Sequence, residues 1–344
     1  MISIVIIHYN GQILIERAIN SILTYTKNEV KLEFLIIDNS QNLNRLFLTN
    51  AKINFIYHDP GYNCGFARAV NYGIKNAKGD YVLLMNQDAS LTEQNTILKL
   101  IQKQKELPEK TILGCSLKDE NSNFQESVWI DDPDLKREWR FSPIYQKFHP
   151  NWQKDFEKKK KAIHNQSGWV HRINGAFLLF KKPTKIEDIL FDEDFFLYGE
   201  DVEWALRIKK TGWQFYHNHM LTIMHIGGAS SSNESIKQMQ IICSDWLVVK
   251  KIKGNFYLAL QLLLILFNKS FDLSLLKIAK WRGKTIDPQI SSLTTKNTVL
   301  YFYLIKKYAL KVLFQNKFSA EKSFEINCYQ NDIMFVFKTN QENL

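Results

Sequence analysis

Short β-rich runs alternate with helical stretches over the first hundred residues, and this alternation constrains the fold more than any other feature of the chain. Strands that alternate with helices of this length imply βαβ units and a mostly parallel central sheet flanked by helices. We therefore expect an α/β fold. Strands are predicted over 3–8, 32–38, 54–58 and 81–85, and helices over 12–25 and 66–75.

Polar residues follow three of these predicted strands. Tyr9 and Asn10 follow the first, Asp38 ends the second, and Gln87 and Asp88 follow the fourth. In open α/β sheets, ligands bind beyond the carboxyl ends of the strands, near a switch in strand order. The sequence therefore predicts one ligand site to which three strand ends contribute.

The charge of the chain is concentrated near its C-terminal end. The net charge is +10, but residues 250–322 hold 14 basic and 3 acidic side chains, which leaves the rest of the chain at −1. This pattern indicates a basic face with an anionic partner. The 344 residues suggest one large domain, or one domain with a substantial C-terminal extension. A composition of 45% hydrophobic and 23% charged residues excludes disordered, collagen-like and disulfide-scaffold classes.

Three features bear on the cellular location of the protein. The four cysteines are far apart with no CxxC pair, which argues against a zinc knuckle or a redox motif and favours a reducing compartment. Residues 2–7 predict a buried strand in place of a signal peptide. The longest strongly apolar stretch, Phe256 to Phe267, has 12 residues, short of the roughly 20 that span a bilayer. We expect a cytoplasmic protein, either soluble or peripheral on the inner face of the cell membrane.

The later part of the chain divides by composition. Residues 118–165 are predicted to be irregular, with the run Lys158 to Lys161 as a solvated basic patch. A strand over 172–180 and a helix over 202–210 are predicted next, and the chain beyond His225 becomes helical, basic and apolar. We therefore expect one domain over 1–235, with halves of about 1–100 and 101–235, and a helical basic region over 236–344.

Two residues at strand ends have candidate binding roles. The Asp38 carboxylate would accept the imide N–H of uracil or thymine, although Asp is also a common turn residue. Asp88 follows an apolar strand and would bind a divalent cation that carries a diphosphate. Hard oxygen ligands suit Mg²⁺ or Mn²⁺, and an Asx turn is the alternative interpretation.

Two further positions have candidate catalytic or ligand roles. Glu200 and Asp201 open a helix, where carboxylates are favoured by the macrodipole. The aromatic residues 195–198 before them would raise a carboxylate pKa and suit a general base. His225 precedes a glycine pair and is interpreted either as a ligand or as a structural residue.

Taken together, these motifs resemble family 2 glycosyltransferases, which are inverting, nucleotide-sugar-dependent enzymes with the GT-A fold. The closest likeness is to the rhamnosyltransferase-like branch that builds bacterial surface polysaccharides such as O-antigen or capsule. The resemblance covers residues 2 to about 232. It depends on Ser3–Asn10, Ile36–Ser40, Asn63–Ala67 with Asn71 and Gly73, Asn86–Asp88, Asn174–Ala176, Phe191–Glu193, Phe196–Asp201, Arg207, Gly212–Trp213 and His225–Gly228.

The resemblance implies a mechanism and a site. Asp201 is the implied catalytic base, which deprotonates an acceptor hydroxyl in a single displacement that inverts the anomeric carbon. Asp88, helped by His225, is the implied anchor for Mg²⁺ or Mn²⁺, because Asn86 replaces the first Asp of the family's metal motif. The implied nucleotide-binding residues are Tyr9, Asn10, Asp38, Asn63, Gly65, Phe66, Ala67, Asn71 and Gln87. The implied acceptor or donor-sugar contacts are Asn174, Gly175, Ala176, Glu200 and Trp169, in an acceptor-binding half over about 101–235.

The expected partners follow from the same resemblance and from the charge. The donor is a dTDP- or UDP-sugar carrying rhamnose or another hexose, and the acceptor is a glycan or a polyprenyl-diphosphate-linked saccharide. Residues 256–267 and 299–314 would lie on an anionic membrane surface, and a packing or homo-oligomer interface is the alternative.

The sequence is compatible with two other functional classes. One is a catalytically silent nucleotide- or glycan-binding subunit with a degenerate metal motif, against which the intact Glu200, Asp201 and His225 argue. The other is nucleic-acid binding, which is not expected because the basic residues are not interleaved with a stacking or groove-reading motif.

Overall fold

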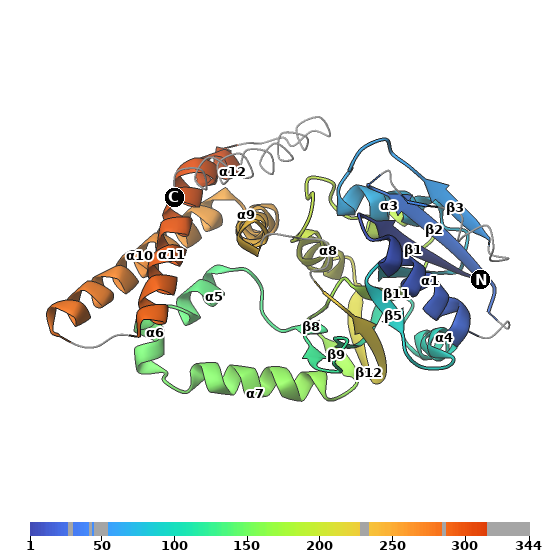
Figure 1. Cartoon of the computed structure of the whole chain (residues 1–344), viewed down its shortest axis with the longest axis horizontal. Helices are drawn as coiled ribbons and strands as arrows, with labels where there is room; N and C mark the ends of the chain where they lie inside the picture. The colour runs from blue at the N-terminus through green and yellow to red at the C-terminus, as the bar shows by residue number, and fades with distance from the viewer. Residues whose placement is uncertain (27–29, 41–42, 45–53, 228–233, 284–286, 315–344) are drawn as a thin grey trace. The chain divides into compact units, whose positions relative to one another are not determined.

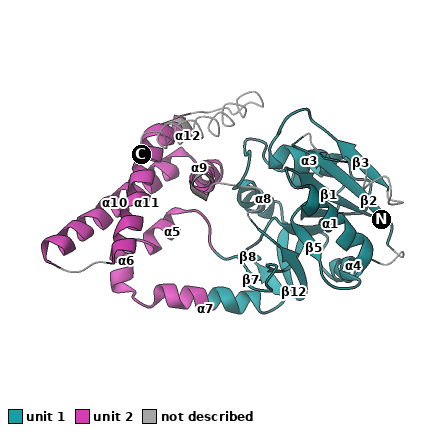
Figure 2. Ribbon diagram, viewed as in Figure 1, with its two compact units in different colours: residues 1–130, 159–232 teal, residues 131–158, 233–344 magenta. Residues whose placement is uncertain are grey.

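The computed structural model describes residues 1–26, 30–40, 43–44, 54–227, 234–283 and 287–314. The chain divides into two compact units (Figure 2). Unit 1 comprises residues 1–130 and 159–232, and unit 2 comprises residues 131–158 and 233–344. The division at residue 232 lies close to the expected boundary near 235, whereas residues 131–158 belong with the C-terminal region.

Unit 1 is an α/β fold, as predicted (Figure 1). Its helices are α1 (Gln12–Tyr25), α3 (Phe66–Asn76), α4 (Thr96–Glu106) and α8 (Glu200–Lys209), with a 3₁₀ turn over Ile186–Ile189. Its strands are β1 (Ile2–His8), β2 (Leu32–Asp38), β3 (Phe55–His58), β4 (Tyr81–Asn86), β5 (Ala89–Leu91), β6 (Thr111–Lys118), β7 (Phe124–Gln125), β8 (Val128–Trp129), β9 (Gly168–Val170), β10 (Arg172–Ile173), β11 (Phe177–Lys181) and β12 (Gln214–His225).

The main sheet is mixed, with the strand order β3-β2-β1-β4-β11-β6-β12-β5. The predicted parallel part is β3-β2-β1-β4, and β6 and β12 are also parallel. Strand β11 runs antiparallel to both β4 and β6, so the sheet is less parallel than we expected. Strand β1 lies between β2 and β4 and runs parallel to both, so the carboxyl ends of all three strands lie along one edge of the sheet. The strand order changes direction at β1, which is where ligands bind in open α/β sheets.

The strand predicted over 172–180 is two strands, because Asn174 breaks it. The Asn174 amide N–H donates to Ser127 O at 2.9 Å, and its side chain donates to Glu126 O at 3.1 Å. Its Oδ1 accepts from Ala176 N at 2.9 Å. These side-chain bonds to the backbone replace the ladder bonds of a continuous strand, since Asn competes with regular structure in this way.

Both faces of the sheet are covered, as buried parallel strands require. Ile4 and Ile6 of β1 pack in the hydrophobic cluster that includes α1 and α4, whereas Val5 packs in the cluster that includes α3 and α8. This alternation is the period of two that the sequence of β1 predicts. Gly73 lets α3 approach the sheet closely, because a Cβ there would lie 2.3 Å from a methyl group of Val5.

The prediction that residues 118–165 are irregular is wrong. This segment contains α5 (Leu135–Arg140), α6 (Pro143–Phe148) and α7 (Trp152–His164), in addition to β7 and β8. Asp134 and Ser142 cap α5 and α6 by accepting from backbone N–H groups, at 3.0 and 3.1 Å. The run Lys158 to Lys161 lies within α7, because Lys is a good helix former as well as a solvated residue.

Unit 2 is helical, which confirms the prediction for the C-terminal region. It contains α9 (Glu234–Lys253), α10 (Asn255–Trp281), α11 (Pro288–Leu304), a π-helical turn over Ile305–Ala309, and α12 (Leu310–Phe314). Helix α5 packs on these helices: Arg137 Nη2 donates to Asp245 Oδ2 at 2.8 Å, and Glu138 O accepts from Asn268 Nδ2 at 3.2 Å. In the part of the chain that the structure describes, no helix combines the length and apolarity needed to cross a bilayer.

Candidate active site

Asp88 and His225 lie together at one edge of the sheet. Asp88 follows β4 and precedes β5, and the pairing of β5 with the end of β12 brings His225 opposite Ala89. Asp88 Oδ1 is 3.4 Å from His225 Nε2, and both side chains are largely buried. Asp88 Oδ2 also accepts from Gly227 N at 3.1 Å. The two residues predicted to bind a metal are thus neighbours, although 137 positions separate them in the sequence.

Gln125 of β7 fixes the orientation of the His225 ring. Its Nε2 donates to His225 O at 2.7 Å, so its Oε1 is free to accept from His225 Nδ1 at 2.9 Å. His225 Nδ1 therefore carries the proton, and a neutral ring directs the lone pair of Nε2 toward Asp88. Gln125 could not be predicted from the sequence, because a lone Gln in a two-residue strand matches no motif.

The Asp88–His225 pair fits a divalent cation. Two adjacent ligands of an octahedral ion at about 2.1 Å lie roughly 3 Å apart, close to the 3.4 Å between these two atoms. Within the described residues, no group of three or more His, Cys, Asp or Glu side chains gathers as a metal cage. The remaining ligands of a bound Mg²⁺ or Mn²⁺ would therefore be water and phosphate oxygens, as is common for these ions.

Glu200 and Asp201 begin α8 after a sharp turn. Tyr198 and Gly199 both have positive φ, +65° and +82°, and a non-glycine residue in this region is strained. Glu200 is buried, and among the residues that the structure describes its Oε2 has no hydrogen-bond partner. Burial raises the pKa of Glu200, and the charge of Asp201 raises it further.

The environment of Asp201 suits a general base. Burial raises the pKa of Asp201, against the opposing effects of the Arg172 charge and of backbone hydrogen bonds from Val202 and Gly175. A carboxylate with a raised pKa takes up a proton more readily near neutral pH. Arg172 is a buried residue of β10 that the sequence analysis did not single out.

Contacts with the preceding loop hold α8 in place. Trp204 Nε1 donates to Ile189 O at 2.7 Å, and its ring stacks on Phe191 with 4.6 Å between centroids. Arg207 donates to Leu190 O at 2.8 Å and pairs with Glu203 at 2.8 Å. The predicted base therefore stands on a fixed helix start.

The turn over residues 174–176 links the base to the metal motif. A Cβ on Gly175 would lie 3.5 Å from Asp201 Cβ, so this backbone is close to the base. On its other side, Ala176 O accepts from Asn86 N at 2.9 Å. Three of the predicted acceptor or sugar contacts, Asn174, Gly175 and Ala176, thus lie between Asp201 and the segment that carries Asp88.

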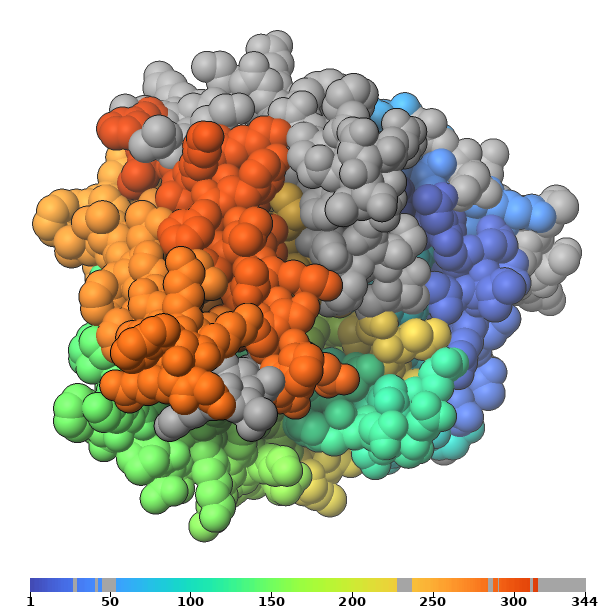
Figure 3. Space-filling model, turned by 60° about the vertical axis from the view of Figure 1, so that its left-hand side comes forward, coloured from blue at the N-terminus to red at the C-terminus, as the bar shows by residue number. Residues whose placement is uncertain are grey.

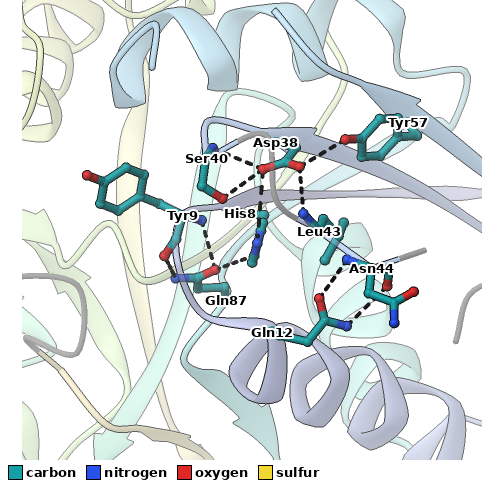
Figure 4. Close-up of polar contacts among 9 residues, drawn as sticks. All are labelled: His8, Tyr9, Gln12, Asp38, Ser40, Leu43, Asn44, Tyr57 and Gln87. Atoms are coloured by element: carbon teal, nitrogen blue, oxygen red, sulfur yellow. Dashed lines mark hydrogen bonds and ion pairs between the residues drawn. The ribbon is translucent and has the colours of Figure 1, made fainter. Parts of the chain in front are cut away.

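Asp38 is buried at the end of β2, and the chain itself occupies its carboxylate (Figure 4). Oδ1 accepts from the Ser40 amide and hydroxyl, at 3.0 and 2.9 Å, and Oδ2 accepts from Leu43 N and the Tyr57 hydroxyl, at 3.1 and 2.9 Å. Burial raises the pKa of Asp38, but these hydrogen bonds outweigh it and hold the pKa below its ordinary value. A base N–H would bind Asp38 only by displacing one of these donors, and this predicted role stays a prediction.

Gln87 is also engaged within the protein (Figure 4). Its side-chain amide pairs with the backbone of Tyr9, donating to Tyr9 O at 2.7 Å and accepting from Tyr9 N at 3.0 Å. His8 Nδ1 is 3.0 Å from Gln87 Oε1 and therefore donates to it. Gln87 thus joins the ends of β1 and β4, and Asn10 follows as an exposed residue with φ of +46°.

The segment from Asn63 to Asn71 is tied to the loop before α8. Gly65 has φ of +82°, and a Cβ there would lie 2.8 Å from Phe196 O, so only glycine fits. Phe66 N donates to Phe196 O at 2.7 Å, and the Asn71 side chain makes two bonds to the backbone of Phe191. The remaining predicted positions lie along the same segment: Asn63 accepts from Gly65 N, and Ala67 is buried on α3. Their nucleotide-binding roles stay predictions.

Trp169 lies away from the Asp88–His225 pair. It is exposed on β9, which pairs with Phe215–His217 of β12, and its ring packs edge-on against Tyr216. His225 ends the same strand, but β12 bulges between Asn218 and Thr222, so His225 lies only roughly 20 Å further along at the usual rise per residue. A contact between Trp169 and a sugar stays a prediction.

Comparison with known proteins places the chain in a family. The family model described as Glycosyl transferase family 2 matches residues 3–182, just over half of the chain. An uncharacterized glycosyltransferase of Rickettsia typhi is 24% identical over 251 residues, which cover 72% of this chain and 70% of the relative. The poly-β-1,6-N-acetyl-D-glucosamine synthase of Staphylococcus aureus is 26% identical over 205 residues, but these cover 58% of this chain and only 44% of that synthase.

Solved structures support the same fold. GalNAc-T7, solved with UDP, GalNAc and Mn²⁺, matches with a TM-score of 0.53 and 16% identity, over 75% of this chain and 50% of that one. The mannosyltransferase PcManGT of Pyrobaculum calidifontis, solved with GDP-Man and Mn²⁺, matches with a TM-score of 0.51 and 14% identity. The match covers 92% of this chain and 88% of PcManGT. At this level of identity the likeness shows the fold alone. On the family match, supported by this fold, the chain belongs to glycosyl transferase family 2 and is a transferase with a GT-A-type fold.

Proposed function

We propose that the protein transfers rhamnose or another hexose from a dTDP- or UDP-sugar to a glycan acceptor, with inversion at the anomeric carbon. The acceptor is linked to a polyprenyl diphosphate, and the product is a bacterial cell-surface polysaccharide such as O-antigen or capsule. The observation that carries the proposal is the turn at residues 174–176, which contacts Asp201 on one side and the Asn86–Asp88 segment on the other. A base and a metal anchor on either side of one turn are the parts that a single displacement needs.

In the proposed reaction, Asp201 accepts the proton of an acceptor hydroxyl. The hydroxyl oxygen forms a bond to the anomeric carbon as the bond from that carbon to the nucleotide diphosphate breaks on the opposite face. The raised pKa of Asp201 supports this role, because a base whose pKa approaches the working pH transfers protons efficiently. The neighbouring Glu200, also with a raised pKa, is proposed to contact the acceptor or the donor sugar.

Asp88 and His225 are proposed to hold Mg²⁺ or Mn²⁺, which stabilises the negative charge of the leaving diphosphate. Their separation of 3.4 Å and the orientation of His225 by Gln125 support this assignment. GalNAc-T7 and PcManGT were both solved with Mn²⁺ and a nucleotide, which supports a metal and a nucleotide donor for this chain as well.

The nucleotide is proposed to bind beside β1, β2 and α3. Tyr9, Asn10 and the Asn63–Asn71 segment would line it, and Asp38 would meet the base by exchanging one of its four internal donors. The acceptor class rests on the S. aureus relative, which is named as a polysaccharide synthase, and on the basic C-terminal region. We place the enzyme on the cytoplasmic side, at the inner face of the cell membrane.

The test is a donor screen on the full chain. Binding and slow hydrolysis of dTDP-rhamnose, UDP-glucose, UDP-galactose and UDP-N-acetylglucosamine are measured with and without Mn²⁺, for wild type and for Asp201→Asn. Asp155→Asn, at an exposed carboxylate of α7, is the matched control. We expect one donor to bind to all three proteins and to be turned over by wild type and control only. NMR of the product should show an inverted anomeric centre.

The opposite outcome supports the alternative function. If no nucleotide sugar binds under any metal condition, the chain is a silent binding subunit and the transferase proposal fails. If a donor is turned over with retention of configuration, the single displacement fails while the transferase assignment stands.

A further inference from the structure

An apolar stripe runs along the exposed side of α10 in two parts, which are separated by the exposed Ser270 and Ser274. Its members recur every three, four, seven or eleven residues, which places them on one face of a helix with 3.6 residues per turn. The exposed fraction is 78% for Phe256 at one end of the stripe and 85% for Trp281 at the other. The stripe consists of Phe256, Leu260, Leu263, Phe267, Ile278 and Trp281.

The opposite side of α10 is the side that packs within unit 2. Leu258, Leu262 and Ile265 are buried there, and Leu258 and Leu262 belong to the cluster that includes Trp246 and Tyr308. Asp272 is the one acidic residue of α10, and it lies about 160° around the helix from Phe256. The stripe is therefore separate from the core of the unit, and no carboxylate of its own helix interrupts it.

Basic residues lie at both ends of the stripe. Lys253 precedes its first residue, and Lys277, Lys280 and Arg282 surround its last. Next to that end is an open hollow of ≈ 670 Å³ lined by Lys280, Pro288, Ser291, Ser292, Thr295 and Lys296. These helices are the orange and red-orange part of the surface in Figure 3. The stripe thus spans about 38 Å in two apolar parts, with Lys253 and Lys277 at its edges, whereas Lys280 and the hollow lie about 120° around the helix from its centre.

We propose that this stripe lies on an anionic lipid surface, with Lys253, Lys277 and Arg282 near the headgroups. An interfacial helix has this distribution of apolar and basic side chains. A second copy of the chain is a poorer partner, because parallel and antiparallel pairing of two stripes would both bring lysines together. Anionic headgroups complement these charges instead. The proposal concerns lipid binding alone and does not depend on the proposed transfer reaction.

The experiment is flotation of the full chain with two kinds of vesicle, without any sugar donor. Vesicles of phosphatidylcholine with 30% phosphatidylglycerol are compared with vesicles of phosphatidylcholine alone. The variant Phe256→Ser/Leu263→Ser/Phe267→Ser tests the stripe, and Ile13→Ser/Met220→Ser is the matched control at equally exposed apolar positions in unit 1. Thermal unfolding checks that both variants fold.

We expect wild type and control to bind the anionic vesicles, and the stripe variant to bind them at least about tenfold more weakly. Binding should also weaken in 0.5 M NaCl, since screening reduces the attraction of lysines to headgroups. Equal flotation of the stripe variant and wild type would overturn the proposal. So would a wild-type dimer, measured by light scattering, that the stripe variant abolishes while vesicle binding is unchanged. Donor hydrolysis is measured separately and should be equal in wild type, stripe variant and control. If none of the three hydrolyses a donor, the proposed reaction is contradicted, but the lipid-binding proposal is not affected.

Discussion

The end of β2 and the start of α8 each bury a carboxylate in unit 1, yet the two places differ in their hydrogen bonds. Asp38 accepts from four donors, whereas one oxygen of Glu200 has no hydrogen-bond partner within the described part of the chain. The pKa of Asp38 is lowered and the pKa of Glu200 and of Asp201 is raised. The balance between burial and hydrogen bonds therefore decides whether a carboxylate stabilises the fold or remains available for proton transfer: hydrogen bonds prevail at Asp38, and burial prevails at Glu200 and Asp201.

The largest expected effect is on turnover, and it concerns Asp201. Asp201→Asn should lower kcat by about 10²–10⁴-fold, because an amide does not accept the proton of the acceptor hydroxyl. Its stability at pH 7 should not fall, since burial disfavours the charge that the substitution removes. Steady-state kinetics and thermal unfolding measure the two quantities. If Asp201→Asn keeps its activity, or loses it only because it unfolds, Asp201 is not the base, and it does not differ in role from Asp38.

The next effect concerns metal affinity and Gln125. Gln125→Leu should weaken Mn²⁺ binding by about 10–100-fold, because the His225 ring loses the acceptor that fixes its orientation. Gln125→Glu keeps an acceptor for Nδ1–H but loses the donor to His225 O, so an intermediate affinity is expected. Calorimetric titration of Mn²⁺ in the presence of UDP measures this without turnover. Gln166→Leu, at an exposed glutamine, is the control, and an unchanged affinity in Gln125→Leu would contradict the assignment.

The third prediction is that substitution of Asp38 lowers the free energy of unfolding. Asp38→Asn should cost about 2–3 kcal/mol of unfolding free energy at pH 7, because an amide cannot accept from all four donors. The lowered pKa means that the stabilisation is present above the ordinary value near 3.9 and is lost as the pH falls through the folded-state pKa. The difference from wild type should therefore shrink in acid.

Urea unfolding of wild type and Asp38→Asn at several pH values measures this difference. Tyr57→Phe removes one donor to the same carboxylate and should cost about 1 kcal/mol. A cost for Asp38→Asn that does not change with pH would show that the charge of Asp38 is not what stabilises the loop.

Substitution of Glu200 should have the smallest effect, and it should raise the free energy of unfolding where substitution of Asp38 lowers it. Because its pKa is raised, the ionised form destabilises the fold, and this destabilisation grows as the pH rises above the ordinary value of 4.5. Glu200→Gln should therefore be more stable than wild type at pH 8, by at least about 1 kcal/mol, and equal to it below pH 4.5. Glu187→Gln, at an exposed carboxylate, should change neither value. A Glu200→Gln variant that is less stable at pH 8 would mean that the carboxylate has a favourable partner.

Most of the first hundred residues could be predicted from the pattern alone. The predicted ranges of α1 and β2 match the structure, and those of β1, β3, α3 and β4 differ by one residue at an end. Periodicity succeeds there because alternate side chains pack on opposite faces of one sheet. It fails at Asn174, and at α5 to α7, because side-chain bonds to the backbone and helix caps decide the structure at those places.

The site was predictable in its residue types but not in its partners. A polar residue at a strand end is equally compatible with a turn and with a ligand contact, and the structure shows the inward bonds of Asp38, Gln87 and Asn71 that no spacing reveals. Gln125 reaches His225 across 100 positions, and only the pairing of β6 with β7 and β12 brings them together. Such contacts between distant residues cannot be predicted from composition or spacing.

The turn at residues 174–176 lies between the proposed base Asp201 and the segment that carries Asp88. The Gly175 backbone lies against Asp201, since a Cβ there would be 3.5 Å from Asp201 Cβ, and Ala176 O accepts from Asn86 N. The proposed base and the strand end that carries the proposed metal anchor therefore adjoin the same three-residue turn. Insertion or deletion of even one residue in this turn should change the distance between them, and with it the size of sugar that would fit.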